Sequence, residues 1–159
     1  ARTPREAGSR MSRELPRYLE LAEELEAAQQ PLPIVFGHND LLPANILDDG
    51  ERLWIIDFEY AGFSTAMFDL AGLSSNAGFT LEESEELLGR YFDCRPELPL
   101  KRSLAAMQCA SLLREAMWSM VSELYLQAPG VDYEAYTREN LERLEQALES
   151  YRSRFGSTP

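Results

Sequence analysis

The segment from residue 38 to residue 59 constrains the fold more than any other part of the sequence. It begins with the polar run HNDLLPAN (38–45), whose central proline predicts a loop. Two short apolar runs follow, Ile46–Leu47 and Leu53–Ile56, and the DDGER run between them favours a tight reversal. Asp57, Phe58 and Glu59 come directly afterwards. We therefore expect a loop and a small antiparallel β-hairpin that brings the two polar runs to one edge.

Helices are predicted on both sides of this segment. Residues 14–29 carry leucine and alanine at steps of three and four, which gives one apolar stripe, and two prolines end the pattern. Ile34–Phe36 is typical of a short strand. A loop is expected over residues 58–64, and helices are then expected over residues 68–76, 80–92, 100–126 and 132–151. The expected fold class is α+β and mostly α-helical.

Composition fits one globular domain or one lobe of a larger domain. The chain has 159 residues, of which 45% are hydrophobic and 26% are charged. Its formal charge of −12 has the wrong sign for a nucleic-acid partner and disfavours an anionic membrane. The sequence shows no run long enough for a spanning helix and no signal pattern. Two non-vicinal cysteines indicate reduced thiols, so we expect a cytoplasmic protein.

Three oxygen-bearing side chains in the constrained segment suit phosphoryl transfer. That reaction needs a carboxylate to orient the attacking hydroxyl and oxygen ligands that hold Mg²⁺ across the nucleotide phosphates. Asp40 suits the first role, and Asn45 and Asp57 suit the second. The order H-x-D-x-x-x-x-N followed by Asp-Phe is that of a kinase catalytic loop and metal-binding Asp. An iron site with two histidines is excluded because His38 is the single histidine, and we expect it to support the loop backbone.

The motifs resemble the choline/ethanolamine kinase branch of the aminoglycoside-phosphotransferase-like kinases. The matching runs are HNDLLPAN (38–45), LWIIDFEYAG (53–62), FDLAGL (68–73) and REAMWSMV (114–121). The resemblance covers residues 14–153 and implies a protein-kinase-like, two-lobed fold. Residues 13–159 would be the C-terminal lobe, and residues 1–12 would be a flexible tail or linker remnant.

The N-terminal lobe of that family has no counterpart in this sequence. Its phosphate-covering loop and nucleotide lysine are both lacking, because the single lysine, Lys101, falls in a predicted helix. The sequence also has no P-loop and no G-x-G-x-x-G run. We therefore expect the N-terminal lobe of the same protein to be a partner, and we expect this lobe alone to be inactive. An apolar surface should be exposed around the hairpin and Phe58.

The resemblance also implies roles for individual residues. Asp40 would be the catalytic base, and Asn45 and Asp57 would be the magnesium ligands. Leu47 and Ile56 would line the floor beneath the adenine of ATP. His38 and Asp69 would support the loop, and the acceptor substrate would contact Glu59, Tyr60, Phe79, Glu115 and Trp118.

An aromatic acceptor site has a physical rationale. A quaternary ammonium group cannot donate hydrogen bonds, so aromatic faces and nearby negative charge recognise it. The candidates for the aromatic walls are Trp118, Tyr60, Phe79 and Tyr125, and those for the charge are Glu115 and Glu59. Trp118 could equally pack in the core. Glu115 stands where eukaryotic choline kinases tend to carry a second tryptophan, which leaves ethanolamine or another amino alcohol open beside choline.

The expected function is ATP- and Mg²⁺-dependent phosphorylation of the hydroxyl of a small amino alcohol, first choline and then ethanolamine. Two alternatives remain open. The chain could come from another small-hydroxyl phosphotransferase, such as an aminoglycoside or homoserine kinase. It could also be a catalytically silent, kinase-like helical binding module, against which the complete set of Asp40, Asn45 and Asp57 argues.

Overall fold

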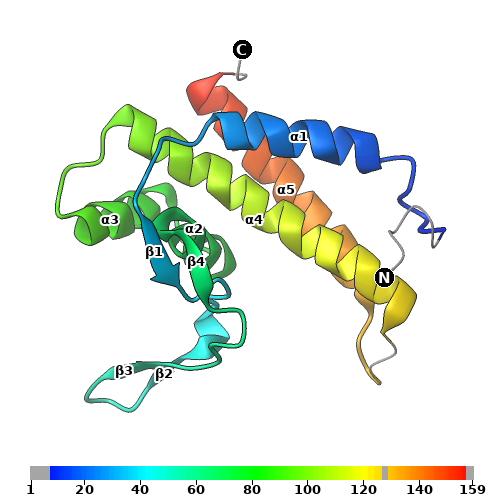
Figure 1. The fold of residues 1–159 in the computed structure, drawn as a ribbon, viewed down its shortest axis with the longest axis horizontal. Helices are drawn as coiled ribbons and strands as arrows, with labels where there is room; N and C mark the ends of the chain where they lie inside the picture. The colour runs from blue at the N-terminus through cyan, green and yellow to red at the C-terminus, as the bar shows by residue number, and fades with distance from the viewer. Residues whose placement is uncertain (1–7, 127–128, 157–159) are drawn as a thin grey trace. The chain divides into compact units, whose positions relative to one another are not determined.

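The computed structural model describes residues 8–126 and 129–156 (Figure 1). The chain divides into two compact units. Residues 28–108 form one, termed the loop unit, and residues 1–27 and 109–159 form the other, termed the helical unit. The long helix α4 (Leu98–Tyr125) begins in the loop unit and ends in the helical unit. No helix in the described part of the chain is long and apolar enough to cross a membrane.

The loop unit contains two small antiparallel sheets. β1 (Ile34–Gly37) pairs with β4 (Gly62–Thr65), so that Gly37 lies opposite Gly62. The short 3₁₀ turn η1 (Pro43–Asn45) leads into the hairpin of β2 (Ile46–Asp48) and β3 (Leu53–Ile55). The expected hairpin is therefore confirmed. β2 extends one residue beyond the apolar run Ile46–Leu47, and β3 ends one residue before Ile56.

Helices enclose the core of the loop unit. α2 (Ala66–Asn76) and α3 (Leu81–Phe92) pack with the first turns of α4 around fully buried Met67, Ala71 and Leu88. A capping box starts α3: the Thr80 hydroxyl accepts from the Glu83 backbone N–H, and the Glu83 carboxylate accepts from the Thr80 N–H. The first turn of α2 carries Asp69, the residue expected to support the loop.

The helical unit consists of α1 (Leu15–Ala27), the rest of α4 and α5 (Tyr133–Phe155). Leu25, Leu144 and Tyr151 are almost fully buried and form much of its apolar interior. Arg17 pairs with Glu145, and Glu24 pairs with Arg152. Both pairs join α1 to α5 with a spacing of seven residues in each helix, so the two helices run in the same direction.

The structure corrects the expected loop over residues 58–64. Gly62–Thr65 forms β4, whose partner β1 lies 28 residues earlier in the chain. α4 also begins at Leu98 instead of residue 100, because a proline is tolerated in the first turn of a helix, where its missing N–H has no partner to lose. Residues 1–7 of the expected tail lie outside the described residues. Ser9 to Ser12 form a hydrogen-bonded turn, and Arg10 pairs with Glu123.

Candidate active site

The loop that carries Asp40 is closed by hydrogen bonds to its own backbone. The Asp40 carbonyl oxygen accepts from the Leu42 N–H at 2.8 Å and from Asn45 Nδ2 at 3.0 Å. Asn45 is buried at the end of η1, and its amide nitrogen is committed to this bond. The bond leaves the amide oxygen as the Asn45 atom that could bind a metal, and it ties Asn45 directly to the residue proposed as the base.

Asp69 anchors the start of the same loop from the first turn of α2. Its two carboxylate oxygens accept from the backbone N–H groups of His38 and Asn39, each at 2.7 Å. Asn39 has a φ of 63°, in the left-handed region, so its N–H and that of His38 converge on one carboxylate. Charge-assisted bonds of this kind are stronger than neutral ones, which suits a loop that must keep one shape.

His38 connects the loop to the residues after the hairpin. Its Nε2 lies 2.8 Å from the Ile56 carbonyl oxygen and donates to it, and its ring centroid lies 4.7 Å from that of Phe58. Within the described chain, His38 Nδ1 is buried without a hydrogen-bond partner. Asp57 follows Ile56 with a φ of 65°, an uncommon conformation for a residue other than glycine that is often found at functional sites.

Gly37 provides the space in which these bonds form. A Cβ at this position would lie 2.8 Å from Asp69 Oδ2 and 2.8 Å from Ser64 Oγ, closer than packed atoms approach. A side chain at residue 37 would therefore force the Asp69 carboxylate or the Ser64 hydroxyl to move, whereas glycine leaves both in place.

Replacing Gly37 with alanine is expected to lower the free energy of unfolding by about 1 to 3 kcal/mol, because the methyl group must displace its neighbours. Denaturant unfolding measures the loss. In the double variant Gly37→Ala with Ser64→Ala, one of the two close contacts is removed, so the combined loss should be smaller than the sum of the single losses. Strictly additive losses would contradict this explanation.

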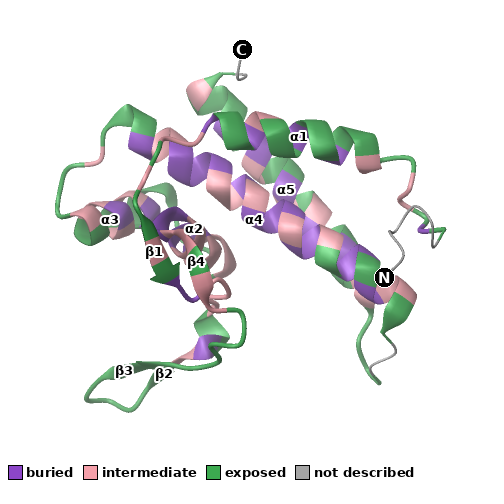
Figure 2. Cartoon of the chain, in the orientation of Figure 1, coloured by how far each residue is buried: buried purple, intermediate pink, exposed green. Residues whose placement is uncertain are grey.

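The two residues expected to lie beneath adenine belong to the hairpin. Leu47 lies opposite Trp54 in the β2–β3 ladder, and the Ile56 N–H donates to the Asn45 carbonyl oxygen. The hairpin is exposed along both strands (Figure 2). Leu47, Ile56 and Phe58 are between 41% and 54% exposed, which confirms the expected apolar surface around the hairpin.

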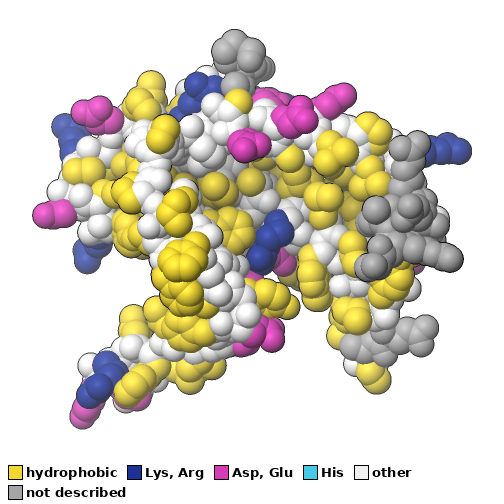
Figure 3. Space-filling view, in the orientation of Figure 1, with side chains coloured by type: hydrophobic (Ala, Val, Ile, Leu, Met, Phe, Trp, Pro, Cys, Tyr) yellow, Lys and Arg dark blue, Asp and Glu magenta, His cyan; other side chains and the backbone are white. Residues whose placement is uncertain are grey.

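Exposed apolar side chains also cover the sheet of β1 and β4. Hydrophobic atoms gather over these strands in the space-filling view (Figure 3). Phe36 and Phe63, cross-strand partners, contact each other edge to face with ring centroids 5.7 Å apart.

The donor set fits Mg²⁺ bound together with nucleotide phosphates. Asp57 offers an exposed carboxylate, and Asn45 offers an amide oxygen. Across the described residues, no cluster of three or more His, Cys, Asp or Glu side chains is arranged to hold a metal by itself. Mg²⁺ is usually bound through one or two carboxylates plus substrate phosphates, so a sparse oxygen set is the kind of site it uses.

The helical unit contains an aromatic cluster around Trp118. The Trp118 ring meets Tyr133 and Tyr136 edge to face, with centroids 6.1 Å and 6.4 Å apart. The Tyr136 hydroxyl donates to Glu115 Oε2 at 3.2 Å, and Arg114 donates to Glu115 Oε1 at 2.7 Å. Burial, together with the Glu115 charge, raises the pKa of Tyr136, so its hydroxyl remains a donor at neutral pH.

The surroundings of Trp118 show whether it packs in the core, and they add Tyr133 and Tyr136 to the candidate acceptor residues. Trp118 is 49% exposed, so it is not a core residue. Tyr133 and Tyr136 were missed because the last helix has the polar composition of a surface helix. Their spacing of three residues in the first turn of α5, which places both on one helix face, was the available signal.

The remaining predicted acceptor residues belong to the loop unit. Glu59 and Tyr60 form the turn after Asp57, and Phe79 follows the end of α2. All three are exposed. Glu115 and Trp118 belong to the helical unit, so the expectation that they share one pocket with these three residues stays a prediction.

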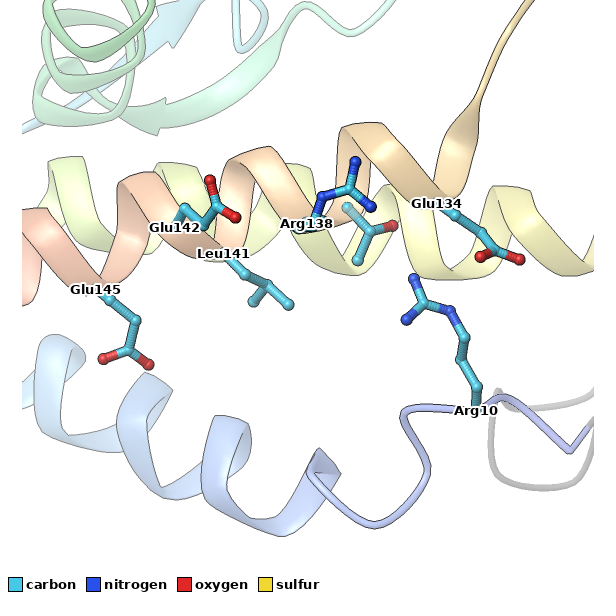
Figure 4. Close-up of a pocket in the computed structure, with 7 residues that line it drawn as sticks. Arg10, Glu134, Arg138, Leu141, Glu142 and Glu145 are labelled. Atoms are coloured by element: carbon cyan, nitrogen blue, oxygen red, sulfur yellow. The ribbon is translucent and has the colours of Figure 1, made fainter.

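A cavity of about 290 Å³ lies elsewhere in the helical unit (Figure 4). Arg10 reaches towards it from the segment before α1, and α5 supplies the rest of its lining: Glu134, Thr137, Arg138, Leu141, Glu142 and Glu145. None of these residues was predicted to bind substrate or metal, and their charges are mixed. The cavity lining therefore includes no residue of the predicted site.

Comparisons with known proteins agree with the motifs. The phosphotransferase enzyme family model matches residues 2–100. A probable ethanolamine kinase from Arabidopsis thaliana is 31% identical over 104 residues, which cover 58% of this chain and 27% of that protein. Protein LicA from Haemophilus influenzae is 41% identical over 54 residues, which cover 34% of this chain and 20% of that protein.

Among solved structures, a choline/ethanolamine kinase family protein from Mesorhizobium loti matches with a TM-score of 0.75 and 28% identity. The match covers 88% of this chain and 47% of that one. It confirms the predicted fold class, and it shows that the chain spans about half the length of the solved protein. Because the family model matches more than half of its residues, the chain belongs to the phosphotransferase enzyme family.

Proposed function

We propose that this chain is the C-terminal lobe of a kinase that transfers the γ-phosphoryl group of ATP to the hydroxyl of a small amino alcohol, choline or ethanolamine. The observation that carries the proposal is the linked set of loop residues. Asn45 is bonded to Asp40, and His38 of the same loop holds the carbonyl next to Asp57. Phosphoryl transfer needs a base and metal ligands held in fixed relation. This loop carries Asp40 and Asn45, and its bond to the Ile56 carbonyl ties it to the chain next to Asp57.

In the proposed reaction, Asp40 accepts the proton of the acceptor hydroxyl as that oxygen attacks the γ-phosphorus of ATP, and the bond from phosphorus to the bridging oxygen breaks and releases ADP. Asn45 and Asp57 would hold Mg²⁺, which when bound neutralises charge on the phosphate oxygens. The hydrogen bonds to Asp69 keep the loop in place, so the base needs no rearrangement before reaction. Leu47 and Ile56 would face the adenine ring, which a second lobe would cover. Without that lobe the chain is proposed to be inactive.

The aromatic cluster supports an ammonium-bearing acceptor. Trp118 presents a half-exposed ring, and Glu115 adds a carboxylate that is linked to the cluster through Tyr136. A cation close to an aromatic face and an acid is stabilised without hydrogen bonds of its own. One relative is a probable ethanolamine kinase, which agrees with an amino alcohol acceptor.

Replacing Trp118 with alanine in the full-length protein is expected to raise KM for choline by roughly 30-fold, the equivalent of about 2 kcal/mol of desolvated cation–π contact. KM for ATP should change little, and the half-exposed position means that the melting temperature should fall only slightly. Trp118→Phe should retain much of the affinity because a ring face remains.

Trp54 provides the matched control. It is 48% exposed, almost the same as Trp118, but it lies on the hairpin, where its indole N–H donates to Asp49 at 2.6 Å. Trp54→Phe should leave KM for choline unchanged. Equal effects of the Trp118 substitution on choline and ATP would argue against the proposed cation site.

A panel of acceptor alcohols tests the function itself. The purified full-length protein, supplied with ATP and Mg²⁺, should phosphorylate choline or ethanolamine in preference to homoserine and aminoglycosides. Preference for an acceptor from the second group would replace the proposed substrate. Absence of transfer to every hydroxyl acceptor would favour a silent binding module.

A further inference from the structure

The loop that carries Asp40 is tied to the chain after the hairpin at two points. His38 Nε2 donates to the Ile56 carbonyl oxygen at 2.8 Å, immediately before the proposed metal ligand. Asn39 Nδ2 donates to the Tyr60 carbonyl oxygen at 3.0 Å, three residues after the same ligand. The segment between Ile56 and Tyr60 is therefore held on both sides by adjacent residues of one loop.

Asn39 forms hydrogen bonds through its backbone N–H and through both polar atoms of its side chain. Its backbone N–H donates to Asp69 Oδ1 at 2.7 Å, and its side-chain Oδ1 accepts from Ser64 Oγ of β4 at 2.6 Å. One residue thus joins the first turn of α2, β4 and the turn at Tyr60. Contacts to three separate elements are more than a spacer between a histidine and an aspartate requires.

The surroundings of Asn39 restrict which residue can stand there. A Cβ at Gly37 would lie 3.3 Å from Asn39 Oδ1, and a Cβ at Gly62 would lie 3.3 Å from Asn39 Nδ2, so two facing glycines leave room for the amide. The φ of 63° favours Asn, Asp or Gly. Among these three, Asn alone carries both a donor for the Tyr60 carbonyl and an acceptor for the Ser64 hydroxyl.

We propose that Asn39 is a positioning residue that fixes the Asp57–Glu59 segment relative to Asp40 by clamping the Tyr60 carbonyl. The catalytic part of this inference rests on the proposed function. Asn39 does not need to touch the substrate. It acts by keeping the proposed base and the proposed metal ligand at one separation, and misplacement of reacting groups by 1 Å can lower a rate by about a hundredfold.

Two substitutions at Asn39 test the role of its side-chain hydrogen bonds apart from its left-handed backbone conformation. Asn39→Gly keeps the left-handed conformation but removes both side-chain bonds. Asn39→Asp keeps an acceptor for Ser64 and replaces the donor with an oxygen that repels the Tyr60 carbonyl. In the full-length protein both variants should lower kcat by roughly tenfold to a hundredfold. Ser64→Ala leaves the bond to Tyr60 in place, so it should lower kcat less.

The split among kinetic constants distinguishes positioning from general support of the fold. KM for ATP and for the amino alcohol should change by less than about threefold, because the binding groups remain. The Mg²⁺ concentration for half-maximal rate should rise in Asn39→Gly and Asn39→Asp as Asp57 loses its fixed position. A wild-type kcat in Asn39→Gly would overturn the proposal. So would a lower melting temperature with unchanged kcat and unchanged Mg²⁺ dependence.

Amide hydrogen exchange tests the clamp without any activity. The Ala61 N–H, which belongs to the same peptide group as the clamped Tyr60 carbonyl, donates to the Phe58 carbonyl oxygen at 3.0 Å, and the Ile56 N–H donates to the Asn45 carbonyl oxygen outside this group. Asn39→Gly should speed exchange of the Ala61 amide by tenfold or more, because the local structure opens more easily without the clamp. The exchange rate of the Ile56 amide should stay unchanged. Unchanged exchange at Ala61 would overturn the clamp. If the wild-type protein transfers no phosphoryl group, the proposed function fails, and this comparison still decides the clamp.

Discussion

Replacing Asp40 with alanine in the full-length protein is expected to lower kcat by about 10² to 10⁴, the range contributed by a positioned acid or base. The fold should remain intact, because hydrogen bonds to the Asp40 carbonyl oxygen hold the loop. That carbonyl accepts from Leu42 and Asn45, and both bonds survive removal of the side chain. Steady-state kinetics with ATP and an amino alcohol measure the loss, and thermal unfolding checks the fold.

Asp40→Asn is the matched control for shape. It keeps the size and a hydrogen-bonding oxygen but cannot take the hydroxyl proton, so its kcat should fall almost as far as that of Asp40→Ala. Retention of more than about a tenth of the wild-type kcat by Asp40→Ala, a loss below 1.4 kcal/mol, would show that Asp40 is not the base.

Local patterns predicted most helices and the hairpin, because periodicity, capping and turn signals lie within a few residues of one another. The Thr80 capping box and the Asp-Gly reversal are examples. β4 was not predicted, because its glycine, serine and threonine content is typical of loops and because it is stabilised by β1, 28 residues away. Strand formation depends on cross-strand neighbours that a local pattern does not contain.

The candidate site shows the same difference between local patterns, which the sequence reveals, and contacts between distant residues, which it does not. Asp40, Asn45 and Asp57 were identified because their chemistry and spacing form a recognisable order. Asn39 was passed over, although it lies beside Asp40, because its partners Tyr60 and Ser64 lie 21 and 25 residues later. A side chain whose role is to bridge distant elements leaves no periodic signal in the sequence.

Asp57 is the second position where a large loss is expected. Asp57→Ala removes the charged oxygen ligand proposed for Mg²⁺, and charge stabilisation by a bound metal contributes several kcal/mol, so kcat/KM should fall by at least about a hundredfold. The measurement is the rate as a function of Mg²⁺ concentration. Activity that persists at wild-type Mg²⁺ levels would remove Asp57 from the metal site.

The left-handed φ of 65° at Asp57 makes a second explanation testable, namely that aspartate stands there only to adopt an uncommon backbone conformation. Asp57→Gly adopts that conformation without strain, and Asp57→Asn tolerates it. If conformation were the whole role, both variants would keep their activity. If the charge is the role, Asp57→Gly should be as inactive as Asp57→Ala. Asp57→Asn, which retains a neutral oxygen, should recover part of its rate at high Mg²⁺ or Mn²⁺ concentration, because a weaker ligand is offset by mass action.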